Sequence, residues 1–505
     1  MKYLFNILIA SLIFILTSCS DFLDLKPRHK WEVDKTMTTY NKAVQSVNGI
    51  YGIFMPEDNL NQAYYAALTT KSGFMLLTNT NDYDLIYDQT TGGNSSIWST
   101  CYEAINACNL AVNGIPKVPA SAFPNDKISN ELIGEARFLR GYLHSIILLN
   151  YCLWWDNDDN KYGMIYRDQT TDVSNVNRPR LTVGESWKKV MDDIDFGIEN
   201  MPATFTTARK ASKVFAKAYK AKLLLIRGTM RNSKTDLTDA KALVDDVINN
   251  LPSNIKMEGD MSQTFIKAWD SQENIFVRYL EDISGRTGNA GSWSNYGLAY
   301  EAATKFLNSS GMEVAQSDAE CGVKYGLDWM RSDPRWYIAT GKARSPEDWD
   351  DTYTWTWTKI YRKGRYEGQI SNPLDEKYAC YHMRLPELYI MQAELIARTG
   401  GSISNALAPI NLMRSKRSNP VLPQIMAPAT LDELMEIIFK EYVNELILEN
   451  GAEYYASLRF NHEGKTYMEV IKGGSFVLDK NKLQWPIPNE EIQSNPLIEQ
   501  NPGQK

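Results

Sequence analysis

The sequence lacks the motifs that identify several large classes of enzyme and nucleic-acid-binding protein. It contains no GxSxG, HExxH, P-loop or dinucleotide-binding motif, so no common site for hydrolysis or nucleotide binding is indicated. Lys and Arg form no cluster and the net charge is -7, which argues against nucleic acid as the main partner. With 61 acidic residues, chance pairs of carboxylates are unavoidable and are no argument for a glycosidase. We therefore predict that the protein is not an enzyme.

Cysteine and histidine are also scarce, with six and four residues in a chain of 505. No CxxC pair occurs, and Cys101 and Cys108 would stand about 10.5 Å apart along a helix axis, too far for a disulfide. We interpret both as buried thiols. The histidines are far apart in the sequence and have no zinc-ligand spacing. No metal ion or cofactor is predicted.

The N-terminus has the pattern of a secretory signal. Lys2 is followed by an almost wholly apolar run from Leu4 to Leu16, which is shorter than the roughly 20 residues that span a bilayer. Small residues then precede Cys19, as in the bacterial lipobox, where the cysteine thiol is acylated and the signal is removed. We predict a signal peptide over residues 1–18 and a lipid anchor on Cys19 that holds the mature chain at a membrane.

Most of the remaining chain has the period of amphipathic helices, because apolar residues recur every three or four positions. The predicted helices lie at about 35–54, 98–112, 131–151, 183–198, 211–227, 238–249, 385–398, 404–417 and 431–450. Thr182 with Glu185, and Thr430 with Glu433, form capping boxes at two helix starts. Pro409 is unexpected inside a helix, where it costs about 3 kcal/mol or forces a kink.

Three regions lack this period. Residues 59–91 read as a polar loop with tyrosines, and residues 483–503 as a proline-rich, non-helical tail. Between them, a long span is rich in Gly, Ser, Asn and Trp, and the alternation of Tyr353, Trp355 and Trp357 predicts a strand. We predict an all-α-dominated fold with three parts after the signal: an N-terminal helical scaffold at 19–252, an irregular inserted lobe at 253–381, and C-terminal helices and tail at 382–505.

Several separated motifs together resemble the SusD/RagB-like nutrient-binding lipoproteins of the Bacteroidetes outer membrane. The matching residues are Cys19, Asp21, Phe22, Leu23, Asp24 and Pro27; Trp98, Tyr102, Ile105 and Asn109; Glu135, Ala136, Phe138, Leu139, Arg140 and Gly141; Glu387, Tyr389, Ala393 and Glu394; Ile410, Asn411 and Arg414; and, in the tail, Pro486, Ile487, Pro488, Glu491, Asn495, Pro496, Gln500, Asn501, Pro502 and Gly503.

The chain departs from the family pattern in one region. Glu441, Glu445 and Glu449 keep an acidic row, but Tyr442 stands where an arginine is usual. Ser457 and Leu458 replace an expected Asp-Leu element. Because of these changes, the ion pairs that the family forms at these positions cannot be assumed for this chain.

The resemblance implies a scaffold of four tetratricopeptide-like helix pairs and an irregular lobe that binds ligand. It also implies a partner, a SusC-like TonB-dependent transporter on which the lipoprotein closes as a lid. The location would be the outer membrane, lipid-anchored and facing the cell surface. Substrates in this family are usually oligosaccharides or polysaccharides and less often peptides.

A glycan site needs flat aromatic faces for sugar rings and polar side chains at their edges. Two regions offer both, and the predicted ligand contacts are Asn81, Asp82, Tyr83 and Tyr87 in the first region and Trp293, Tyr296, Trp349 and Trp355 in the lobe. Two alternatives stay open. A peptide-binding protein would present a groove with backbone acceptors, and a helical-array glycosidase would place two carboxylates in one cleft.

Overall fold

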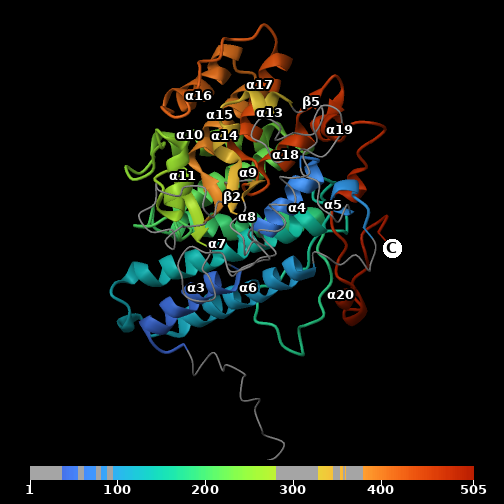
Figure 1. Ribbon diagram of the computed structural model, residues 1–505. Coiled ribbons are helices and arrows are strands. Elements are labelled where there is room, and N and C mark those ends of the chain that lie inside the picture. The colour runs from blue at the N-terminus through green and yellow to red at the C-terminus, as the bar shows by residue number, and fades with distance from the viewer. Residues whose placement is uncertain are drawn as a thin grey trace, which may run out of the picture.

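The computed structural model describes residues 37–54, 62–74, 81–87, 95–279, 328–344, 353–356, 359 and 379–504. Among these residues helices dominate and strands are short, which confirms the predicted fold class (Figure 1). Cys19, Trp293, Tyr296 and Trp349 lie outside the described residues, and Trp355 is described only in its backbone. No helix among the described residues combines the length and the apolar character that a membrane span needs.

The described residues of the N-terminal part of the chain are mostly helical. They are α3 Tyr40–Phe54, α4 Gln62–Ser72, α5 Asn81–Asp84, α6 Ser95–Gly114, α7 Asp126–Tyr151, α8 Val183–Asn200, α9 Lys213–Met230 and α10 Lys234–Asn249. The start of α7 is five residues earlier than predicted, because the side chain of Asn125 accepts a hydrogen bond from the Lys127 amide and caps the helix there.

Helices α7 and α8 illustrate how neighbouring helices pack. Gly134 of α7 lies against Asn200, whereas Gly141, two turns later, lies against Asp193, so the two helices run antiparallel. A Cβ atom on Gly134 would stand 2.9 Å from the Asn200 Cβ, so only glycine permits this close approach. Asp193 is buried, and Arg140 reaches across from α7 to pair with it at 2.7 Å.

The C-terminal part repeats this design. Its helices are α15 Leu385–Arg398, α16 Ile403–Ser415, α17 Leu431–Leu446, α18 Ala452–Arg459, α19 Tyr467–Lys472 and α20 Asn489–Ser494. Helix α15 packs against α10, α16 and α17, which joins the two helical parts. Both predicted capping boxes are present, at the starts of α8 and α17, and α16 continues through Pro409 as predicted.

Two sequence interpretations were wrong. The region read as a polar loop, residues 59–91, contains α4, in which every side chain from Tyr64 to Ser72 is buried. A helix that is buried on all sides has no apolar stripe, so its sequence does not show the 3.6-residue period of an amphipathic helix. The tail is not wholly non-helical, because α20 begins directly after Pro488, whose fixed φ suits a helix start.

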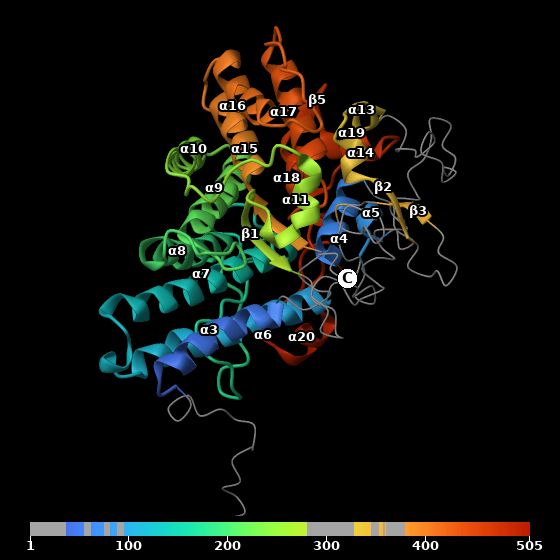
Figure 2. The ribbon, with the colours of Figure 1, turned by 60° about the vertical axis from the view of Figure 1, so that its left-hand side comes forward.

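A pair of strands joins the early part of the predicted lobe to the start of the C-terminal helices. Strand β1, Asn274–Tyr279, is labelled in Figure 2. It pairs antiparallel with β4, Ala379–Arg384, and Val277 lies opposite Tyr381. Within the lobe are α11 Met261–Lys267, α13 Asp328–Ser332, α14 Trp336–Ala339, β2 Gly341–Arg344 and β3 Tyr353–Thr356. Strand β3 pairs with β2 and confirms the predicted strand. A further short hairpin joins β5 Asn461–His462 to β6 Lys465–Thr466.

A cluster of buried charges also joins the lobe to the scaffold. We call it the α17 ion cluster, and its members are Glu273, Asp333, Arg335, Lys359, Arg384, Arg414, Arg417, Glu441, Glu445 and Glu449. Five carry positive and five carry negative charge, so the cluster is neutral as a whole. The acidic row on α17 is therefore ion-paired within the protein.

The short ion pairs of the cluster offset the cost of burying its charged side chains. Arg384 binds Glu449 and Glu273 at 2.7 Å each, and Arg335 binds Glu441 at 2.8 Å. Burial alone would raise the pKa of Glu445, but Arg417, Arg384 and Arg335 outweigh it and hold that pKa well below its usual range. The Glu445 carboxylate therefore stays charged. Glu441, Glu445 and Glu449 each pair with side chains of both the lobe and the scaffold.

Candidate functional site

The first predicted contact region forms a short loop on the surface. Residues 81–87, here called the 81–87 loop, begin with α5 and turn at Leu85, whose φ is 54°. Leu85 is buried and holds the loop to the core, whereas Ile86 is 62% exposed. Within the loop the Ile86 amide donates to the Asn81 carbonyl at 3.1 Å. The loop is thus a folded turn whose outer face meets solvent.

Asp82 is held from two sides. Its Oδ1 accepts hydrogen bonds from the Tyr87 hydroxyl and from Nε1 of Trp485, both at 2.8 Å. In the part of the chain that the structure describes, Oδ2 accepts none. Trp485 lies 403 residues further along the chain, in the C-terminal tail. The carboxylate is therefore fixed through one oxygen.

Lys71 of α4 lies beneath this loop. Its ammonium donates to the Leu483 carbonyl and stands 4.3 Å from the centre of the Trp485 ring. The rings of Tyr454 and Tyr87 are at 5.6 and 5.7 Å. Burial lowers the pKa of Lys71 to about 7, and the nearby Asp82 carboxylate opposes that shift. The lysine thus places a cation among aromatic rings between α4 and the tail.

Tyr83 is the aromatic side chain of the loop that a ligand could stack on. It is partly exposed, and the Lys472 ammonium of α19 donates to its carbonyl and lies 5.1 Å from its ring centre. Burial, and next the Asp84 carboxylate, raise the pKa of Tyr83 to about 12, so its hydroxyl stays protonated and can donate a hydrogen bond. Asn81, also partly exposed, adds an amide beside it.

The structure thus brings four predicted residues together, Asn81, Asp82, Tyr83 and Tyr87, within one turn. The predicted residue Trp355 lies on β3, in the hairpin that β3 makes with β2. Sequence reasoning missed Trp485, Lys71 and Lys472. A single tryptophan directly before a proline-rich tail is the one signal that could have indicated Trp485, but nothing in the sequence names its partner 403 residues away.

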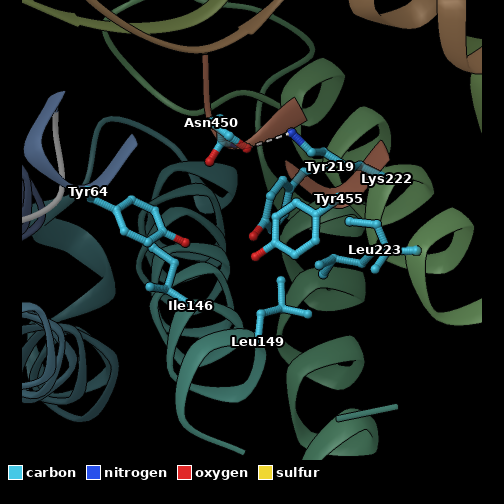
Figure 3. A pocket seen from close by; sticks show the side chains of 9 residues that line it. Tyr64, Ile146, Leu149, Tyr219, Lys222, Leu223, Asn450 and Tyr455 are labelled. Carbon is cyan, nitrogen blue, oxygen red and sulfur yellow. Dashed lines mark hydrogen bonds between the residues drawn. The ribbon is translucent and has the colours of Figure 1, made fainter. Parts of the chain in front are cut away.

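Two small cavities are lined by described residues of the scaffold. One lies between α4, α7, α9 and α18, where Tyr64, Tyr219 and Tyr455 point toward one another (Figure 3). It measures about 10 Å³, and a second beside Glu387 is equally small. This is about the space of one water molecule. Neither cavity can hold a nutrient ligand.

Buried thiols and imidazoles in the described chain have structural surroundings. Cys101, Cys108, Cys152 and Cys380 are free and buried, as predicted for the first two, and burial raises the pKa of Cys152 to about 11. Such thiols are unreactive. Burial lowers the pKa of His382 to about 3, and its Nδ1 lies within hydrogen-bond distance of Tyr65 and Tyr142. No group of three metal-binding side chains occurs among the described residues.

Two sequence families match successive parts of the chain. One is described as "Starch-binding associating with outer membrane" and matches residues 21–225. The other is described as "SusD family" and matches residues 269–503. Among curated relatives, SusD-like protein P38 of Formosa agariphila is 22% identical, and the match covers 99% of both chains. SusD-like protein P2 of the same organism is 23% identical over 81% of this chain and 80% of its own.

Solved structures agree with this fold. A SusD superfamily protein from Bacteroides fragilis superposes with a TM-score of 0.67 at 18% identity, over 93% of this chain and 100% of that one. A structure called a laminarin binding SusD-like protein gives 0.66 at 18% identity, over 92% and 100%. Surface glycan-binding protein A from Bacteroides fluxus gives 0.66 at 15%, also over 92% and 100%. Together with the two family matches, these findings show that the chain is a SusD/RagB-like protein with tetratricopeptide-like helix pairs.

Proposed function

We propose that this protein is a cell-surface lipoprotein that binds an oligosaccharide or polysaccharide and delivers it to a SusC-like TonB-dependent transporter. The observation that carries the proposal is the 81–87 loop, in which Asn81, Asp82 and Tyr83 are consecutive and partly exposed, and the Asp82 carboxylate is fixed by Trp485. An aromatic face beside polar acceptors is the combination that sugar rings require. Two structural relatives, named for laminarin and for glycan binding, support the same ligand class.

The rest of the proposed site comes from the lobe. Trp293, Tyr296, Trp349 and Trp355 would supply further stacking faces, and Tyr87 would support the loop. Because sugars bind largely by such stacking, a few aromatic side chains should carry most of the affinity. No catalysis is proposed, so a bound glycan should be recovered uncut.

The anchor and the transporter complete the proposal. Acylation of Cys19 would hold the protein at the outer membrane facing the cell surface, as the family described as associating with the outer membrane suggests. Cys19→Ala should abolish incorporation of labelled fatty acid into the protein without altering its ligand binding. Copurification of the lipid-anchored protein with a β-barrel transporter would test the partnership.

A glycan array with the chain from Asp21 onward, repeated with a peptide library, tests the ligand class. Binding to a defined glycan without release of a shorter product is expected. Peptide binding with silence on every glycan would replace the proposal by a peptide-binding protein, and cleavage of the bound glycan would replace it by a glycosidase.

Alanine variants then test the site. Tyr83→Ala, Trp293→Ala, Tyr296→Ala and Trp349→Ala should each weaken glycan binding at least about fivefold, since loss of one anchoring aromatic costs more than about 1 kcal/mol. Tyr40→Ala is the matched control, because Tyr40 is a partly exposed tyrosine on α3, outside the loop. Unchanged affinity in all four variants would remove the site assignment while leaving the fold intact.

A further inference from the structure

The Asp82 carboxylate is oriented by groups that have no direct role in the proposed ligand contact. Oδ1 carries both of its hydrogen bonds, from Trp485 and Tyr87, while Oδ2 accepts none within the described residues. A carboxylate that is held through one oxygen presents the other in a defined direction. Oδ2 is therefore suited to accept a hydrogen bond from a hydroxyl group of a ligand.

The tail that supplies Trp485 is itself fixed to the core. The Trp485 amide donates to the Asn150 carbonyl at 2.7 Å, at the end of α7. The Trp485 ring is 1% exposed and contacts the rings of Tyr64 and Tyr151, whose centres are 6.2 and 5.8 Å away. Gln504 closes the tail on itself by donating to the Gln484 carbonyl at 2.5 Å. The indole N–H is therefore a donor in a rigid position.

Lys71 supports the same arrangement from below. Its ammonium lies 4.3 Å from the Trp485 ring centre and binds the Leu483 carbonyl, two residues before Trp485. A cation over an indole face is attracted by the ring quadrupole, most strongly where water is excluded. Lys71 is fully buried and packs against the Trp485 ring.

We propose that Trp485 and Tyr87 are positioning residues that hold the 81–87 loop and leave Oδ2 of Asp82 to accept a hydroxyl of the bound glycan. This inference rests on the proposed function for the ligand, but the loop can be followed without one. The C-terminal tail would then act on binding at a site to which it contributes no contact of its own. Affinity would depend on preorganisation of the loop as well as on its aromatic ring.

The test compares two buried tryptophans whose indole N–H groups each donate a hydrogen bond to a known acceptor. Trp485→Phe removes the N–H that reaches Asp82, and Trp187→Phe is the matched control, because Nε1 of Trp187 donates to the Trp154 carbonyl at 2.9 Å. Trp187 is equally buried but lies on α8. We expect Trp485→Phe to weaken glycan binding about tenfold, as loss of a hydrogen bond to a charged group predicts, and Trp187→Phe to stay within about twofold.

Hydrogen exchange of the loop amides gives a readout that needs no ligand. In Trp485→Phe and Asp82→Ala, the peptide that contains the Ile86 amide should exchange faster than in the wild type. In Asp82→Asn, protection should return, because the amide oxygen can still accept both hydrogen bonds. Trp187→Phe should leave this peptide unchanged.

The outcomes separate the inference from the proposed function. Wild-type exchange of the loop in Trp485→Phe would overturn the positioning role, whether or not a glycan binds. Equal loss of affinity in Trp485→Phe and Trp187→Phe would also overturn it, since the effect would then be general. If the wild type binds no glycan while loop exchange rises in Trp485→Phe alone, the proposed ligand fails but the tail still holds the loop.

Discussion

The α17 ion cluster and the 81–87 loop use charge in opposite ways. In the cluster, Arg384, Arg417 and Glu445 have fully buried side chains, and every charge is matched by partners from other elements. In the loop, the Asp82 carboxylate is only partly buried and accepts its two hydrogen bonds on a single oxygen. The charged side chains that join the lobe to the scaffold already pair with one another. On the loop, by contrast, one oxygen of Asp82 could still accept a hydrogen bond from a ligand.

The largest expected effect comes from breaking the cluster. Arg384→Met leaves Glu273 and Glu449 buried without their main partner, so the free energy of unfolding in urea should fall by about 3–5 kcal/mol. Lys188→Ala removes an exposed pair with Asp192 and is the control, with an expected change below about 0.5 kcal/mol. Similar losses in both variants would mean that the cluster adds no more stability than a surface pair.

Glu453, a buried carboxylate between the C-terminal helices and α4, gives a comparison with the cluster that can be tested by pH. It lies on α18, four residues after Glu449 of the cluster, and accepts a hydrogen bond from Thr69 of α4. Burial raises the pKa of Glu453 from 4.5 to about 7. The folded chain therefore binds this proton more tightly than the unfolded chain, so the stability gained is complete below pH 4.5 and is lost as pH rises through 7.

Glu453→Gln removes this titration and keeps an oxygen for Thr69. In urea unfolding at pH 8 the variant should be more stable than the wild type by up to about 3 kcal/mol, and most of this difference should vanish at pH 5. A gain that is equal at both pH values, or a loss at pH 8, would contradict the assigned burial of a charged carboxylate.

Asp82→Ala should change the free energy of unfolding less than Arg384→Met or, at pH 8, Glu453→Gln. It leaves the buried indole N–H of Trp485 without its acceptor, which predicts a loss of about 2 kcal/mol in the free energy of unfolding. Affinity for glycan should fall in the same variant. If the stability loss approached that of Arg384→Met, the loop would belong to the rigid framework and the comparison would fail.

The smallest effect is expected at the start of α17, the helix that carries the acidic row. Thr430→Ala removes the capping oxygen that the Glu433 amide binds, so stability should fall by about 1 kcal/mol. Thr430→Ser keeps that oxygen and should match the wild type in thermal unfolding. A larger loss than in Arg384→Met would show that the helix, and not its ion pairs, limits stability.

Much of the scaffold could be predicted because its helices carry local signals. Helices α8 and α17 have both an apolar stripe and a capping box, and each begins where the sequence predicts. Helix α4 has neither, because it is buried on all sides. The periodicity of the sequence therefore predicts helices with one exposed face better than it predicts a fully buried helix.

The site and the ion pairs were less accessible to sequence reasoning, because their partners are distant in the chain. Asp82 meets Trp485 across 403 residues, and Arg384 meets Glu273 across 111. Tyr442, the departure from the family pattern, keeps a polar role: its hydroxyl donates to Glu394 at 2.8 Å, and Arg459 pairs with the same carboxylate. The Tyr442 phenol thus adds a hydrogen bond to the ion pair between Arg459 and Glu394, which the sequence did not predict.

The C-terminal segment also has a consequence for the order in which the protein can be completed during synthesis. Asn501 donates to the Tyr151 carbonyl at the end of α7, Asn495 donates to the Arg178 carbonyl, and Arg180 donates to Asn501. Residues made last therefore close hydrogen bonds of residues made more than three hundred positions earlier. Until the C-terminal segment has left the ribosome or a translocation channel, the hydrogen-bonding groups near residues 151–180 lack these partners. Chaperones can bind this part of the chain during that time.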